Sequence, residues 1–187
     1  MVFNVPILSN LIFSPFNYLA NSIYKNADEI VAVSRTYVER ALKCNNRISK
    51  GHIVFLGTKL HEFDLNVKEN TIPKRDQITL AYCGTLGSSY NLICVLDALE
   101  IVNKKGYKAP KFLVMGNGPR QAEFEQYAQK KALDVDFLGL LPYNEMCGVL
   151  SSCDIAVNPI SHGAAQSIIN KHADYAAAGL PVLNTQE

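Results

Sequence analysis

The chain has 187 residues, of which 48% are hydrophobic and 19% charged, the composition of an ordinary globular protein. Its 18 basic and 17 acidic side chains leave a net charge of +1, so no basic excess indicates nucleic-acid binding and no acidic run indicates a solvating tail. None of the five cysteines forms a C-x-x-C pair. This pattern argues against a zinc knuckle or a thioredoxin-type motif and favours reduced thiols in a cytoplasmic protein.

The first 24 residues are apolar but interrupted by Pro6, Asn10, Pro15 and Asn17. They lack a charged leader and a small-residue cleavage site, which argues against a signal peptide. The interruptions argue against a membrane span. We therefore predict a packed helix that belongs to a larger domain.

The next segments predict short elements followed by a boundary. The run at 29–33 predicts a short buried strand and the run at 52–56 another strand, and a helix is expected over 35–43. Ser34 is the expected N-cap of that helix, because its hydroxyl can accept a backbone N–H of the first turn. The polar segment 65–76 has few apolar positions and predicts a linker.

Beyond residue 76 the pattern becomes a regular alternation of strands and helices. Strands are predicted at 78–82, 111–115, 135–138, 154–158 and 181–184, and helices at 91–103, 119–131, 143–152 and 167–178. The strands are nearly all apolar, as expected when both faces of a sheet are covered. The sequence therefore predicts an α/β fold with a Rossmann-like parallel sheet and helices on both faces.

Glycines follow the first two of these strands. In an open parallel sheet, ligands bind outside the carboxyl ends of the strands. Gly84 and Gly87, and then Gly116 and Gly118, would let the backbone approach such a ligand closely. The loop around Leu140 could present backbone groups to a base edge. Each loop taken alone also fits a plain turn between a strand and a helix.

The last loop and helix carry the most specific pattern. Gln166, Asn170 and Asp174 are spaced by four, so they share one edge of the helix if it extends that far. Asp174 could accept from sugar hydroxyls and Lys171 could face phosphate, near the backbone N–H groups of the helix start at Ser167. The alternative is an i,i+3 surface ion pair between Lys171 and Asp174. The opposite edge is small and apolar and should pack on the sheet: Ile169, Ala173, Ala176 and Ala177.

The sequence suggests no catalytic residue and no metal site. His52, His61 and His172 have no partners at ligand spacing, and His162 fits an exposed loop. No nucleophile–base pair is visible. The glycine loops also lack the full G-x-G-x-x-G pattern, which argues against a dinucleotide-dependent dehydrogenase.

Several segments resemble one family in order and spacing. They are ADEIVAVS (27–34), IVFLGTKLHEFD (53–64), ITLAYCGTLG, KFLVMGNGP, VDFLGLLPYNEM, SCDIAVNP and NKHADYAAAGLPV (170–182). Together they resemble the retaining glycosyltransferases of the GT-B fold, group 1 or family 4. The last segment is similar to bacterial members that build envelope polysaccharides.

The resemblance implies a domain organisation. Residues 77–187 would be the nucleotide-sugar-binding C-terminal domain, incomplete at its C-terminal end. Residues 1–64 would be a remnant of the N-terminal, acceptor-side domain, joined by a linker at 65–76. Both ends of the chain therefore look cut, and this fragment alone is expected to be inactive.

The resemblance also implies an activity and its partners. The parent enzyme would transfer a sugar from a nucleotide-diphosphate sugar, its donor substrate, to a glycan or lipid-linked acceptor bound through the missing domain, with retention. No cofactor, metal or nucleic-acid partner is expected. The location would be cytoplasmic, compatible with peripheral contact at the inner face of the membrane.

The family carries two acidic residues separated by seven positions in this last segment. The second falls on Asp174, which would hold the ribose, whereas the first falls on Gln166. A basic residue often follows the first glycine in the family, but Thr85 follows Gly84 here, so Lys171 is the best cation for the diphosphate. A non-catalytic binding or scaffold fragment and a nucleotide-sugar epimerase of the same fold are the alternatives.

Overall fold

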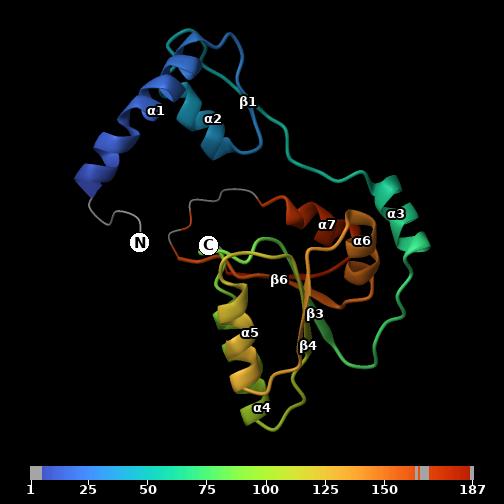
Figure 1. Cartoon of the computed structure of the whole chain (residues 1–187). Helices are drawn as coiled ribbons and strands as arrows, with labels where there is room; N and C mark the ends of the chain where they lie inside the picture. Colours follow the sequence, from blue (N-terminus) through green and yellow to red (C-terminus); the bar gives the residue numbers. More distant parts are fainter. Residues whose placement is uncertain (1–5, 163, 165–168, 186–187) are drawn as a thin grey trace. The chain divides into compact units, whose positions relative to one another are not determined.

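A computed structural model describes residues 6–162, 164 and 169–185. The chain forms two compact units (Figure 1). The first unit ends at Leu56, and the second holds the described residues from Gly57 onward.

The first unit is a pair of short parallel strands with two helices. Its elements are α1 (Pro6–Asn26), β1 (Val31–Ala32), α2 (Arg35–Leu42) and β2 (His52–Ile53). Ile30, Val38 and Ala41 form its small core. Ser34 caps α2 as predicted, because its hydroxyl oxygen accepts the N–H of Tyr37 at 3.3 Å.

The predicted N-terminal helix is present, but most of its large apolar side chains that the structure describes lie on the surface. Phe16, Leu19 and Ile23 are all more than half exposed. Its C-terminal end packs on the small core through Tyr24. Within the described ranges, no helix is both long and apolar enough to cross a membrane.

The second unit alternates strands and helices, which confirms the predicted fold class. Its elements are α3 (Leu60–Glu69), β3 (Thr79–Cys83), α4 (Leu92–Lys104), β4 (Lys111–Met115), α5 (Gln121–Lys130), β5 (Val135–Gly139), α6 (Tyr143–Ser151), β6 (Ile155–Asn158), α7 (Lys171–Ala177) and β7 (Val182–Asn184). The five strands are parallel and lie in the order β5-β4-β3-β6-β7.

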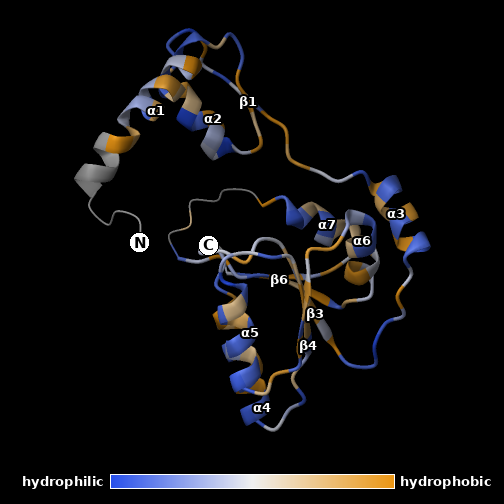
Figure 2. Ribbon diagram, in the orientation of Figure 1, coloured by the Kyte–Doolittle hydropathy of each residue, from blue (hydrophilic) through white to orange (hydrophobic). Residues whose placement is uncertain are grey.

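The two faces of this sheet follow from the alternation of side chains along each strand. Leu80 and Tyr82 of β3 point to one face, where α4 and α5 lie side by side. Ala81 points to the other face, against α6 and α7. Figure 2 shows hydrophobic residues along β4 and mixed colouring on α4 and α5, as expected for helices with one buried side.

One segment departs from the predicted linker. Residues 60–69 form helix α3, so the first part of the polar segment 65–76 is helical. Phe63 is buried and Val67 lies one turn later on the same side, and α3 packs against α6. The burial of Phe63 and the contact with α6 therefore stabilise a helix that looks polar in sequence.

The strand order places a switch point between β3 and β6. The chain proceeds outward from β3 to β4 and β5, then crosses back to β6 on the other side of β3. Loops leaving two neighbouring strands in opposite directions open a crevice at their carboxyl ends. Any ligand of this fold is expected in that crevice.

A cluster of charges joins α4 and α5 on the outside of the unit. The Tyr127 hydroxyl donates to Asp97 at 2.6 Å, and Lys131 donates to the same carboxylate at 3.0 Å. We expect Tyr127→Phe to lower the free energy of unfolding by about 1 kcal/mol, the usual value of one hydrogen bond. Urea denaturation would measure it, with Tyr107→Phe as the control, because Tyr107 is exposed. Equal stability of the two variants would contradict this expectation.

Candidate functional site

The glycine loops after β3 and β4 are bound to each other through their backbones. The N–H of Gly84 donates to Met115 at 2.9 Å, and the N–H of Leu86 donates to Asn117 at 2.8 Å. Gly84 and Gly116 have φ angles of 145° and 129°, which favour glycine. A Cβ atom at Gly116 would overlap the carbonyl oxygen of Gly84. These glycines are therefore required by the close approach of two loops.

The remaining two glycines of these loops differ from each other. A side chain at Gly118 would collide with the backbone of Leu86, so Gly118 has a packing role. Gly87 is partly exposed and has room for a Cβ atom. In the part of the chain that the structure describes, the Gly87 amide donates to no acceptor. The amides of Gly87 and Gly118 both donate to no acceptor among the described residues, and of these two glycines only Gly87 has room for a Cβ atom.

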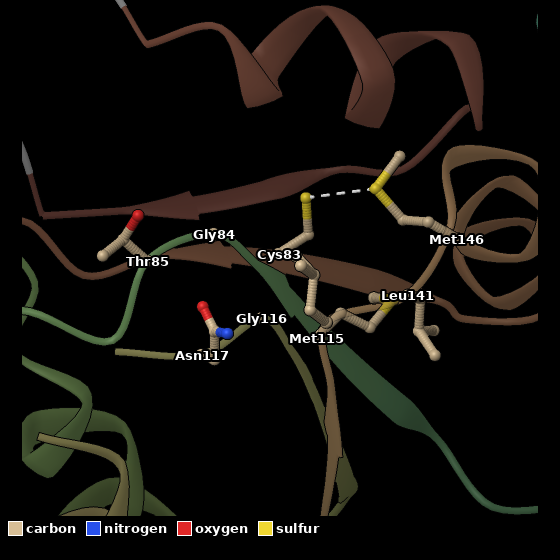
Figure 3. A pocket seen from close by; sticks show the side chains of 9 residues that line it. Cys83, Gly84, Thr85, Met115, Gly116, Asn117, Leu141 and Met146 are labelled. Atoms are coloured by element: carbon tan, nitrogen blue, oxygen red, sulfur yellow. Dashed lines mark hydrogen bonds between the residues drawn. The ribbon is translucent and has the colours of Figure 1, made fainter. Parts of the chain in front are cut away.

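A pocket of about 220 Å³ opens at the carboxyl ends of β3, β4 and β5 (Figure 3). Its lining residues are Cys83, Gly84, Thr85, Met115, Gly116, Asn117, Leu140, Leu141 and Met146. The Cys83 and Met146 sulfur atoms are 3.5 Å apart. Burial raises the pKa of the Cys83 thiol to about 11, so the thiol is protonated at neutral pH. The pocket is therefore mainly apolar, with polar groups from Thr85 and Asn117 (Figure 3).

Lys171 lies beside this pocket with its ammonium buried. The Nζ atom is 4.1 Å from the ring centre of Tyr82 and 3.8 Å from that of Tyr90. A Cβ atom at Gly84 would lie 2.8 Å from it. The ammonium has no hydrogen-bond partner among the described residues. Burial lowers the pKa of Lys171 to about 8, a shift that Cys83 opposes. The buried ammonium is therefore held by the two tyrosine rings, next to the first glycine loop.

Asp174 lies one turn further along α7. Its Oδ1 atom accepts a hydrogen bond from the Tyr143 hydroxyl at 2.9 Å. That hydroxyl is also 2.8 Å from Oγ1 of Thr58. The structure shows no ion pair between Lys171 and Asp174, which rejects the surface-pair alternative. The two charges of α7 point to different partners.

The sequence of the sheet-forming unit matches a known protein family. The sequence profile of the family described as "Glycosyl transferases group 1" matches residues 77–187, more than half of the chain. The chain belongs to the group 1 glycosyl transferases. A search among curated proteins gives no match.

Solved glycosyltransferase structures share the fold at low identity. Sucrose-phosphate synthase from Thermosynechococcus elongatus superposes with a TM-score of 0.70 at 17% identity, over 91% of this chain and 44% of that one. Anabaena Alr3699/HepE in complex with UDP-glucose gives 0.69 at 16%, over 95% and 50%. WaaG, a glycosyltransferase involved in lipopolysaccharide biosynthesis, gives 0.68 at 16%, over 95% and 50%. The chain thus spans about half the length of these proteins, and its sheet corresponds to the C-terminal Rossmann-like domain of GT-B enzymes.

Within this glycosyl transferase, the predicted orientation of α7 needs correction. Of the small apolar edge that is expected to pack on the sheet, Ile169 is buried, but Ala176 is exposed and Ala173 and Ala177 are only half-buried. The buried side carries Lys171 and Tyr175 instead, four residues apart. The Tyr82 and Tyr90 rings explain this, because they accept a buried cation that a hydropathy pattern assigns to solvent.

The other predicted site residues are either exposed or outside the described part of the chain. Asn170 is exposed just before α7, and Leu140 is largely exposed at the pocket. Helix α7 begins at Lys171, so the shared edge with Gln166 is not part of the described helix. Gln166 and Ser167 lie outside the described residues. His162 is exposed, as expected.

Four residues of the site were not singled out from the sequence. Tyr82 and Tyr90 surround Lys171, and Tyr143 and Thr58 reach Asp174. Tyr90 lies two residues before α4, and Tyr143 is the first residue of α6. Both positions lie where a loop after a strand meets the next helix, which is a signal present in the sequence. Tyr82 lies inside an apolar strand and Thr58 before a polar helix, where no local pattern distinguishes them.

Proposed function

We propose that this chain is the donor-binding part of a glycosyltransferase that moves a sugar from a nucleotide-diphosphate sugar to an acceptor. The single observation that carries the proposal is that Lys171 and Asp174 lie on one helix, beside the glycine loops of a group 1 domain. A cation and a carboxylate at the switch point of a parallel sheet suit a phosphorylated, polyhydroxylated ligand. The UDP-glucose complex of HepE, which shares the fold, supports the same ligand class.

Each part of the donor has a candidate partner. The base would enter the apolar pocket near Leu140, and the ribose hydroxyls would donate to Asp174. The diphosphate would lie near the Gly87 amide and the Lys171 ammonium, which would stabilise the negative charge of the leaving group. Asn170, Gln166 and Ser167 would complete this edge. No cofactor is part of the proposal, because the nucleotide sugar is itself the substrate.

The acceptor side belongs to the rest of the proposed enzyme. We propose a glycan or lipid-linked acceptor, transfer with retention and a cytoplasmic location, with contact at the inner face of the membrane where lipid-linked acceptors lie. Activity of the whole protein requires the acceptor-side domain, since this chain spans about half of its structural relatives. For this reason we expect the present chain to bind donor without transferring sugar.

A second candidate is a nucleotide-sugar-binding protein without transfer activity. Gln166 in place of an acidic residue and Thr85 in place of a basic one favour it. An activity assay distinguishes the two candidates. It uses this chain joined to a complementary acceptor-side domain. Release of UDP from UDP-glucose with sugar found on an acceptor supports the transferase, whereas binding without product supports the second candidate.

Donor binding itself can be measured on this chain. We expect UDP to bind in isothermal titration calorimetry and Asp174→Ala to weaken binding about tenfold to a hundredfold, the value of a hydrogen bond to a charged group. Asp76→Ala is the matched control, because Asp76 is an exposed carboxylate of the same unit. Unchanged affinity in Asp174→Ala would show that this carboxylate does not bind the ribose.

A further inference from the structure

Asp174 is held by a tyrosine from a different helix. Tyr143 is the first residue of α6, and its hydroxyl donates to Oδ1 of Asp174 at 2.9 Å. Among the described residues, Tyr143 is the one hydrogen-bond partner of this carboxylate. Among the same residues, the second carboxylate oxygen, Oδ2, accepts no hydrogen bond.

The direction of the hydrogen bonds follows from the chemistry of the groups. An ionised carboxylate only accepts, so the single proton of the Tyr143 hydroxyl goes to Asp174. Thr58, 2.8 Å from the same hydroxyl, must then donate to the Tyr143 oxygen. Burial raises the pKa of Tyr143 to about 12, with Asp174 adding to the rise and Thr58 opposing it, so the phenol keeps its proton at neutral pH. The hydrogen bonds therefore run in one direction, from Thr58 to Tyr143 and from Tyr143 to Asp174.

The helices near these three residues are packed against one another. Helix α3, which begins two residues after Thr58, packs on α6 and on α7 within the second unit (Figure 1). A Cβ atom at Gly148 of α6 would overlap the carbonyl oxygen of Asn70, so α6 and the end of α3 are in close contact. Tyr143 therefore acts from a fixed position relative to Asp174.

We propose that Tyr143 is a positioning residue, which with Thr58 behind it holds Oδ1 of Asp174 so that Oδ2 faces the ribose hydroxyls of the donor. The inference rests on the proposed role of Asp174 in donor binding. A carboxylate with one oxygen fixed loses less rotational freedom when the ligand binds, which is how a preorganised group gains affinity. Thr58, which precedes α3, thereby supports the donor site without touching the ligand.

The test compares two nucleotides on the full chain. We expect Tyr143→Phe to weaken UDP binding about threefold to tenfold, the range of one hydrogen bond, and Thr58→Val to have a smaller effect. Neither variant should change the affinity for 2′,3′-dideoxyuridine diphosphate, which lacks the hydroxyls that Asp174 would bind. Tyr107→Phe is the control, since Tyr107 is an exposed tyrosine of the same unit.

The outcomes separate the two proposals. Equal weakening of both nucleotides by Tyr143→Phe would show a merely structural role and overturn the inference. So would unchanged UDP affinity in Tyr143→Phe while Asp174→Ala loses binding, a result that leaves the proposed function intact. An unaffected Asp174→Ala would instead overturn the ribose assignment.

A second measurement needs no ligand. In a crystal structure of ligand-free Tyr143→Phe, we expect the Asp174 carboxylate to leave the rotamer that it has in the wild-type crystal. An unchanged rotamer would overturn the positioning role even if UDP binding were never observed. Thermal melting of each variant would confirm that the fold is retained.

Discussion

Replacement of Lys171 by methionine is expected to weaken UDP binding about tenfold to a hundredfold while leaving the unliganded fold as stable as the wild type or more so. The ammonium is buried, has no hydrogen-bond partner among the described residues and faces the rings of Tyr82 and Tyr90. Methionine keeps the apolar stem and places a sulfur on the same rings, a favourable contact. It removes the cost of a buried charge and with it the proposed phosphate contact.

The measurements are calorimetric titration with UDP and urea denaturation of the unliganded chain. Lys130→Met is the matched control, because Lys130 is an exposed lysine on α5. Loss of stability without loss of affinity would show that Lys171 serves the fold alone. Loss of affinity in both variants would point to a general charge effect rather than to a contact at this site.

The same buried lysine makes stability depend on pH. Its pKa is about 8 in the folded chain and 10.5 when unperturbed. Between these values the unfolded chain binds more protons than the folded one, so the stability contributed by Lys171 rises with pH across this window. Between pH 7 and pH 11, the free energy of unfolding of the wild type should rise by on the order of 3 kcal/mol relative to that of Lys171→Met. A difference between the two proteins that is constant with pH would contradict the burial of the charge.

The largest expected loss of stability comes from Gly116→Ala. The new Cβ atom would overlap the carbonyl oxygen of Gly84, and the φ angle of 129° is unfavourable for alanine. Overpacking costs roughly 1–3 kcal/mol and the strained backbone about 1–2 kcal/mol more. We therefore expect the free energy of unfolding to fall by about 3 kcal/mol, a large part of the stability of a small domain.

Gly106→Ala separates the two contributions. Gly106 also has a positive φ, 81°, but no atom lies within 4 Å of its Cβ position. Its substitution should cost only the backbone part, about 1–2 kcal/mol. Urea denaturation would measure the loss of unfolding free energy in both variants. Equal losses would show that the two glycine loops can move apart at no extra cost, and that their close approach does not constrain the pocket.

Much of the fold of the second unit could be predicted because its signals are local. The strand at 111–115 was predicted with the bounds it has, and the buried side of α4, with Leu92, Leu96 and Leu99, follows from helical spacing. A strand covered on both faces must be apolar throughout, and a surface helix must be apolar on one side. Helix α3 was missed because its burial rests on Phe63 and a neighbouring helix, not on a continuous pattern.

The sequence alone determined the alternation of elements, the parallel sheet and the glycine loops that follow its first two strands. The tertiary structure decided which side chains gather beside those loops. Lys171 is buried because Tyr82 and Tyr90, from the strand and loop far earlier in the chain, lie over its ammonium. Asp174 is oriented because Tyr143 and Thr58 arrive from two other elements. Secondary structure depends on spacing along the chain, whereas these contacts depend on which elements the sheet order brings together.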